Sequence, residues 1–135
     1  MQLTVITITA LLAWSASAAA VVDTKVLETR DNYYCGSAHV PSTNDCNELY
    51  NAIQSGTAYA NLQSASPRTL RSENCFVSWS NNVVGNSLDL LPYVGNLINS
   101  CVYGGKSGIV KNVHLYNQGE ATAICVSNRG TGCEN

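Results

Sequence analysis

Six cysteines and two histidines are the side chains of this 135-residue chain whose types could support a reactive or metal-binding site. Cysteine thiolates bind metals or attack substrates, and structural zinc sites usually hold cysteines in pairs with about two to four residues between them. The intervals between successive cysteines here contain 10, 28, 25, 23 and 7 residues, and the two histidines are far apart. We therefore expect no metal, no cofactor and no free thiol, but three disulfide bonds. The cysteines are Cys35, Cys46, Cys75, Cys101, Cys125 and Cys133.

Acid–base chemistry is the alternative use of the ionisable residues. His114, with Glu73 or Glu120 and an arginine beside it, would resemble the site of small secreted fungal ribonucleases. The spacing does not single out this set, and the chain has no G-x-S-x-G motif of serine hydrolases. We predict no catalytic residues, and a ribonuclease or other small hydrolase remains the alternative function.

Two features suggest recognition instead of catalysis. Arg129 lies in a glycine-containing turn between the last two cysteines, and arginine is favoured where proteins contact partners, so Arg129 is a candidate partner contact. Tyr33, Tyr34, Tyr59 and Tyr103 lie outside the apolar stripes. They would offer a sugar-stacking surface if the fold gathered them, although tyrosines more often line the rims of a small sheet.

The compartment follows from the first twenty residues. Residues 1–20 combine an apolar run with small residues at 15–20, which is typical of a secretory signal peptide, and the run is short for a membrane span. Removing 20 of the 135 residues leaves 115, which we divide into an N-terminal arm, 21–34, and a single domain, 35–135. The net charge of −2 provides no basic surface for nucleic acid. We expect an extracellular monomer that has no stable membrane span and binds no nucleic acid.

The elements that must position these residues alternate between helical and extended patterns. Ser42 is a suitable N-cap and Gly56 a suitable stop for a helix over about 43–54. A second helix begins at 85–87 and carries an apolar stripe from Leu90 to Val102. Extended patterns follow Arg68 and occupy GIVKNVHLYN and ATAICVSN, with an extra strand around 33–38.

This order predicts an α+β fold, in which an antiparallel sheet of about four strands packs against two helices in a disulfide-stapled sandwich. Six cysteines allow fifteen pairings. We favour Cys75–Cys125 across the strands, Cys46–Cys101 between the helices and Cys35–Cys133 between the chain ends, and this choice is only one of the fifteen.

The pattern as a whole resembles small secreted cysteine-rich proteins of fungi, most closely the necrosis-inducing factor family of effectors, which is in turn similar to small α/β killer toxins. The resemblance covers about residues 35–133. It depends on CG at 35–36, DCNELYNAI at 45–53, NCFV at 74–77, LLPYVGNLI at 90–98, GGKSG at 104–108 and CVSNR at 125–129. The Gly-Asp element that often precedes the second helix in that family is present here only as GNSLD at 85–89.

This resemblance implies an extracellular, non-enzymatic protein and brings no catalytic residues with it. We therefore expect a secreted effector or toxin-like protein that binds a component of a host or competitor surface. A binder of wall glycans and a protease inhibitor are further alternatives. The sequence does not identify the molecular target.

Overall fold

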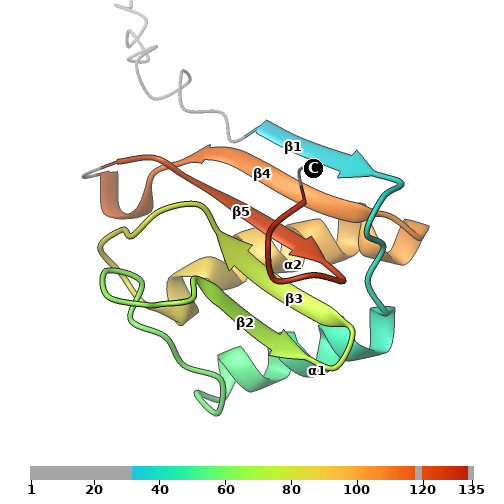
Figure 1. The fold of residues 1–135 in the computed structure, drawn as a ribbon, viewed down its shortest axis with the longest axis horizontal. Coiled ribbons are helices and arrows are strands. Elements are labelled where there is room, and N and C mark those ends of the chain that lie inside the picture. Colours follow the sequence, from blue (N-terminus) through green and yellow to red (C-terminus); the bar gives the residue numbers. More distant parts are fainter. Residues whose placement is uncertain (1–31, 118–119, 134–135) are drawn as a thin grey trace, which may run out of the picture.

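The structure is a computed structural model that describes residues 32–117 and 120–133 (Figure 1). The elements follow the order β1, α1, β2, β3, α2, β4 and β5, with short 3-10 helices at η2, η3 and η4. The predicted signal peptide and most of the predicted arm lie outside the described residues. The sheet already begins at Asn32, within the segment 21–34 that the sequence suggested as an arm.

The five strands form one antiparallel sheet in the order β1-β4-β5-β3-β2. Their bounds are Asn32–Gly36, Thr69–Ser72, Cys75–Trp79, Ser107–Val113 and Thr122–Ser127 for β1 to β5. The predicted α+β class is confirmed. The sheet has one strand more than the approximate count because the extended run after Arg68 contains two strands. They are joined by a turn at Glu73, whose φ is 43°.

A side-chain cap starts α1, whereas α2 continues directly from a 3-10 helix. The helix α1 spans Thr43–Gln54, as predicted, and the Ser42 hydroxyl accepts a hydrogen bond from the Asp45 N–H at 3.4 Å. The helix α2 spans Leu91–Ser100 and follows η2, Ser87–Leu90. The proline at position 92 lies in the first turn of α2, where its missing N–H costs no helical hydrogen bond.

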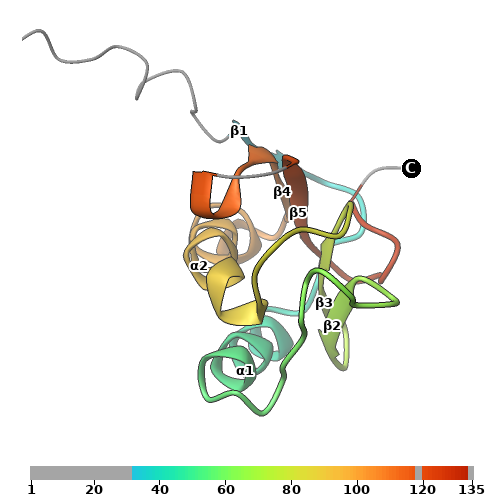
Figure 2. The same ribbon diagram turned by 90° about the vertical axis from the view of Figure 1, so that its left-hand side faces the viewer.

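The two helices cover the same face of the sheet, and the apolar core lies between the two layers (Figure 2). The helices contribute the fully buried side chains of Leu49, Ile53 and Leu97, while the sheet contributes those of Val77 and Ile124. No helix of the described residues covers the opposite face, which is called here the outer face. The alternation of side chains along each strand therefore separates core residues from residues on the outer face.

Two glycines allow close packing within the helical side of the molecule. A Cβ on Gly108 of β4 would lie 2.9 Å from Leu97 Cδ2 and 3.1 Å from Cys101 Sγ, so α2 packs directly on the strand backbone. A Cβ on Gly95 would lie 3.3 Å from Tyr50 Cε2, which belongs to α1. Gly95 of α2 therefore lies directly beside α1.

The strand β4 is shorter than its alternating sequence suggested. Asn112 has a φ of 60°, and the pairing of β4 with β5 shifts between Val110 and Val113, so both valines face the core. The strand ends at Val113, and η4, Leu115–Asn117, follows. His114, predicted in the middle of a strand, is instead an exposed residue beyond the end of β4.

Candidate functional site

All six cysteines form disulfides, but the predicted pairing is wrong. The structure joins Cys35 to Cys101, Cys46 to Cys75, and Cys125 to Cys133. In the β3–β5 register, Cys125 lies opposite Ser78, so both side chains are on the outer face. Cys75 lies three residues before Ser78 in β3, and its side chain faces the core. A Cys75–Cys125 bond is therefore excluded, because the two side chains lie on opposite faces of the sheet.

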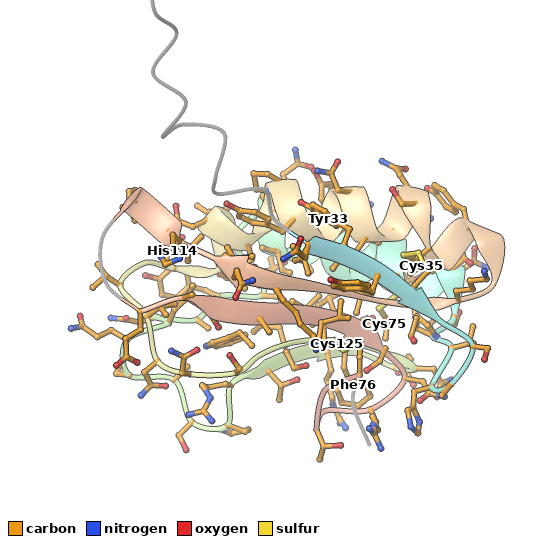
Figure 3. The ribbon with its side chains drawn as sticks, turned by 90° about the horizontal axis from the view of Figure 1, so that it is seen from above. Tyr33, Cys35, Cys75, Phe76, His114 and Cys125 are labelled. Carbon is orange, nitrogen blue, oxygen red and sulfur yellow. A yellow bond between two sulfur atoms is a disulfide. The ribbon has the colours of Figure 1, made fainter. Side chains whose placement is uncertain are left out.

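The other two predicted bonds fail for related reasons. Cys46 lies in the first turn of α1 and meets Cys75, at the first residue of β3. Cys101, at the end of α2, meets Cys35 of β1, so a Cys46–Cys101 bond between the helices does not form. Cys35 faces α2 (Figure 3), whereas Cys133 lies on the outer face, and the predicted Cys35–Cys133 bond would have to pass through the sheet.

The disulfide Cys125–Cys133 fastens the C-terminal segment, residues 128–133, over the outer face of the sheet (Figures 2 and 3). Within this segment, a Cβ on Gly130 would contact Phe76 Cδ1 at 3.4 Å, so the backbone packs against that ring. The Arg129 Nε–H donates to the Gly132 carbonyl at 2.8 Å, and the Ser127 hydroxyl donates to the Arg129 carbonyl at 2.9 Å. Arg129 thus braces the turn, and its contact with a partner stays a prediction.

The C-terminal segment forms one wall of a cleft of about 440 Å³ on the outer face. The other wall is the loop at residues 65–68. The floor includes Ile109, Cys125 and Ser78, which lie opposite one another on the adjacent strands β4, β5 and β3. This outer-face cleft comprises residues 65–68, 78–80, 109, 123, 125 and 130–133.

Two buried polar atoms belong to residues of this cleft. Ser78 is 5% exposed and Trp79 is 4% exposed, and neither Ser78 Oγ nor Trp79 Nε1 has a hydrogen-bond partner among the described residues. A buried polar group without a partner costs stability, and most such groups in proteins are satisfied. Ser78 and Arg68 were not identified from the sequence. The available signal was the alternation of Ser78 and Ser80 with the buried Val77 and Trp79, which places small polar side chains on the uncovered face.

The residues considered for acid–base catalysis do not assemble. Val113 pairs with Thr122 at one end of β5, while Phe76 pairs with Ser127 at the other. His114 and Glu73 are therefore separated by about the length of β5, roughly 16 Å. Within the described residues, no hydrogen bond or ion pair joins His114 to Glu120, whose carboxylate accepts from the Asn81 amide at 3.3 Å.

The arginines of the described residues also lie away from His114. Arg129 follows the far end of β5, and Arg71 lies in β2, opposite Phe76. Arg68, which precedes β2, is separated from His114 by three strand spacings, roughly 14 Å. The described fold does not bring together the histidine, carboxylate and arginine that the alternative ribonuclease function would need.

The four tyrosines that suggested a sugar-binding surface are dispersed. Tyr33 accepts a hydrogen bond from Asn96 of α2, whereas Tyr34, the next residue along β1, points to the other face of the sheet. The Tyr103 hydroxyl donates to Asn47 of α1 at 3.2 Å, and Tyr59 lies in the loop after α1. These side chains do not form one continuous stacking surface.

Asp89 joins η2 to η4 at the end of the sheet where β4 finishes. Its carboxylate accepts the Asn86 N–H at 2.7 Å, which completes a capping box, and also accepts the Tyr116 hydroxyl. The hydrogen bond to Asp89 raises the pKa of the Tyr116 phenol above its usual value, since the bond requires the protonated phenol.

Across residues 32–117 and 120–133, no group of three or more histidine, cysteine, aspartate or glutamate side chains is arranged to hold a metal ion. A search of the same residues finds no helix with the length and apolar character needed to cross a membrane.

No curated protein and no solved structure matches the chain. A family model described as Fungal WD-like matches residues 4–133. The two tryptophans, Trp14 and Trp79, are each followed by serine, and the described residues form one five-stranded sheet, not the four-stranded blades of a WD-repeat propeller. The match covers nearly the whole sequence, and the chain belongs to the fungal WD-like family.

Proposed function

We propose that this fungal protein is secreted and acts without catalysis, by binding a target outside the producing cell. The observation that carries the proposal is the oxidation of all six cysteines into three disulfides. Disulfides of this density persist in oxidising compartments and are rare in the cytosol. The apolar segment at residues 1–20, which has the features of a signal peptide, supports the same compartment.

The positions of the disulfides suit a protein that must remain folded after secretion. Cys46–Cys75 fastens α1 to β3, and Cys35–Cys101 fastens the edge strand β1 to the end of α2. The third disulfide, Cys125–Cys133, fastens the C-terminal segment to the outer face. The edge strand β1, the helix α1 and the C-terminal segment are therefore each cross-linked to a neighbouring element, which lowers the entropy of the unfolded chain and limits local opening to proteases.

A binding role agrees with the dispersal of His114, the glutamates and the arginines, because general acid–base catalysis requires these groups within hydrogen-bond reach of one substrate. The specific activity that we propose to test is necrosis induction in a host or toxicity to a competing microbe. A component of the target cell's surface would be the partner, and the protein would act as a monomer.

The first test is whether the protein reaches the medium. A fungal culture that expresses the full chain is separated into cells and supernatant, and the N-terminus of the supernatant protein is sequenced. We expect a secreted product that begins close after residue 20. Retention of the uncleaved chain in the cells would contradict the proposal.

The second test addresses the biological activity. Oxidised protein is infiltrated into leaves of several plant species and added to competing fungi and bacteria, with reduced and alkylated protein as the unfolded control. We expect a response that requires the oxidised fold. Absence of any response across a broad panel would contradict effector or toxin activity.

The third test separates binding from catalysis. The protein and its His114→Ala variant are incubated with RNA, and pull-downs on chitin and glucan and protease inhibition assays are run in parallel. Cleavage of RNA that depends on His114 would overturn the non-enzymatic proposal. Retention on a glycan or inhibition of a protease would identify the class of target.

A further inference from the structure

The outer-face cleft is polar at one side and apolar at the other. Its polar side is formed by Ser66 and Arg68 on the loop before β2, Ser78 on β3 and Ser80 directly after β3. Towards β4 and β5, the lining consists of Ile109, Ala123 and the Cys125–Cys133 disulfide. A ligand that fills the cleft would therefore place a polar group beside β3 and an apolar group beside β4.

The positive charge of the cleft comes from Arg68. None of the residues that line the cleft is an aspartate, glutamate or histidine, and Arg68 is the only charged residue among them. Within the described residues, the Arg68 guanidinium forms no ion pair or hydrogen bond. Its backbone is fixed beside the cleft floor, because the Trp79 N–H donates to the Arg68 carbonyl at 3.2 Å. A guanidinium in this setting is suited to a carboxylate, which it can bind through two parallel hydrogen bonds.

The buried hydroxyl of Ser78 provides a second recognition group. Ser78 Oγ lies on the cleft floor, 4.0 Å from the position that a Cβ on Gly132 would occupy in the opposing wall. It is 95% buried and has no partner in the described part of the chain, so it can donate to or accept from a group inside the cleft. A polar group deep in a cleft fixes the orientation of a ligand, while the apolar lining supplies contact area.

The dimensions limit the size of the ligand. Ile109 and Ser78 lie on strands with β5 between them, so they are separated by two strand spacings, roughly 10 Å. The volume of about 440 Å³ is at the lower end of the range, roughly 300 to 1,000 Å³, that small-molecule sites occupy. These dimensions suit a short chain or a single ring that carries one polar group.

We propose that the outer-face cleft binds a small carboxylate with a short apolar body. The carboxylate lies against Arg68 and the Ser78 hydroxyl, and the apolar body lies over Ile109 and the Cys125–Cys133 disulfide. The same chemistry is present in a free organic acid and in the C-terminal carboxylate of a peptide. The inference deepens the proposed binding function by specifying the chemical class of ligand, but it does not depend on secretion or toxicity.

The test uses the oxidised full-length chain, labelled with ¹⁵N and titrated with defined probes. Hexanoate and hexanamide compare a carboxylate with its neutral analogue. A tripeptide ending in phenylalanine, with a free or an amidated C-terminus, examines the peptide source. We expect saturable shifts of the amide signals at residues 78–80 and 130–133, with the acids binding more tightly than their amides.

Two variants and a matched control attribute the binding to the cleft. Arg68→Gln should weaken binding of the acid about tenfold or more, because a charge-assisted pair is lost. Arg71→Gln removes the same charge from an exposed residue of β2 outside the cleft, and it should leave the affinity within about twofold. Ser78→Ala should weaken binding about threefold or more without lowering the stability of the free protein, because its hydroxyl has no partner there.

Three outcomes would overturn the proposal. They are equal binding of acids and amides, equal weakening by Arg71→Gln and Arg68→Gln, and absence of saturable shifts at the cleft with millimolar probe. Tighter binding of the free-ended tripeptide than of hexanoate would support the proposal with a peptide as the source, and the reverse would support it with a free acid. A negative result in these titrations would refute the carboxylate site without changing the expected results of the secretion and tissue-response assays. The ligand proposal and the proposed function can therefore be refuted independently.

Discussion

Replacement of Gly108 by alanine tests the close approach of α2 to β4. The new Cβ would lie 2.9 Å from Leu97 Cδ2, 3.1 Å from Cys101 Sγ and 3.2 Å from Cys101 Cβ. Favourable contacts between carbon atoms lie at about 3.5 to 4.0 Å, so the strand and the helix would have to separate. Neither neighbour can move easily, since Leu97 and Cys101 are fully buried and Cys101 is also bonded to Cys35.

The expected cost is the balance of two terms. Overpacking a well-packed core typically costs about 1 to 3 kcal/mol. Replacing glycine by alanine recovers about 0.4 to 1 kcal/mol, because the unfolded chain loses conformational freedom. We expect Gly108→Ala to lower the free energy of unfolding by about 1 to 2 kcal/mol. For a domain of this size, the melting temperature should fall by roughly 5 to 15 °C.

The measurement is denaturant unfolding of the oxidised proteins, with Gly104→Ala as the matched control. A Cβ on Gly104 has no atom within 4 Å, so the same substitution four residues earlier should leave stability unchanged or raise it slightly. Equal slopes of the unfolding curves would show that the variants differ in stability and not in compactness. If Gly108→Ala were as stable as Gly104→Ala, the described packing of α2 on β4 would be refuted.

Three further predictions concern the disulfides, a helix cap and a tyrosine. Paired Cys→Ala replacement should cost about 2.5 kcal/mol for Cys125–Cys133 and about 4 kcal/mol for Cys35–Cys101, whose sequence separations are 8 and 66. Denaturant unfolding measures both losses of stability. A larger loss for Cys125–Cys133 than for Cys35–Cys101 would refute this estimate from loop length. Asn86→Ala removes the cap of η2 and should cost about 1 kcal/mol in the same assay, and an unchanged stability would contradict the capping box. The pKa of Tyr116 is raised by its hydrogen bond to Asp89, so in an ultraviolet titration the Tyr116 phenol should ionise at a higher pH than it does in Asp89→Asn. The hydrogen bond stabilises the fold fully below the unfolded phenol pKa, about 10, and its contribution is lost as pH rises through the raised folded pKa. The stability difference between wild type and Tyr116→Phe should therefore disappear at alkaline pH, and a difference that persisted there would contradict the assigned bond.

The local elements were predictable because their signals are local. Ser42 and Gly56 bracket α1 in the sequence, and both act through hydrogen bonds or backbone angles of their immediate neighbours. The apolar stripe of α2 was equally clear. However, its first turn is a separate 3-10 helix, since Asn86 and Asp89 cap η2 before the proline.

The disulfides and the end of β4 could not be predicted in the same way, because they depend on register. One backbone irregularity at Asn112 shifts the alternation of β4, and with it the position of His114. The sequence did not show on which face of the sheet the Cys125 side chain lies. The pairing of Cys125 with Ser78 in the β3–β5 register places it on the outer face. In β5 both alternate sets contain apolar residues, so its alternation alone does not indicate which set faces the helices.

The position of Cys125 on the outer face explains how a small two-layer fold acquires a cleft. A sheet face without a second layer is an open surface, and a short cross-strand row such as Ile109, Cys125 and Ser78 encloses no volume by itself. The disulfide to Cys133 brings a segment of irregular backbone onto that face, and the Arg129–Gly132 hydrogen bond keeps the segment bent. The shortest of the three disulfide loops contributes least to the entropy of folding, yet it builds the wall of the cleft. Removal of the Cys125–Cys133 disulfide should therefore weaken ligand binding strongly, although this disulfide contributes the least of the three to stability.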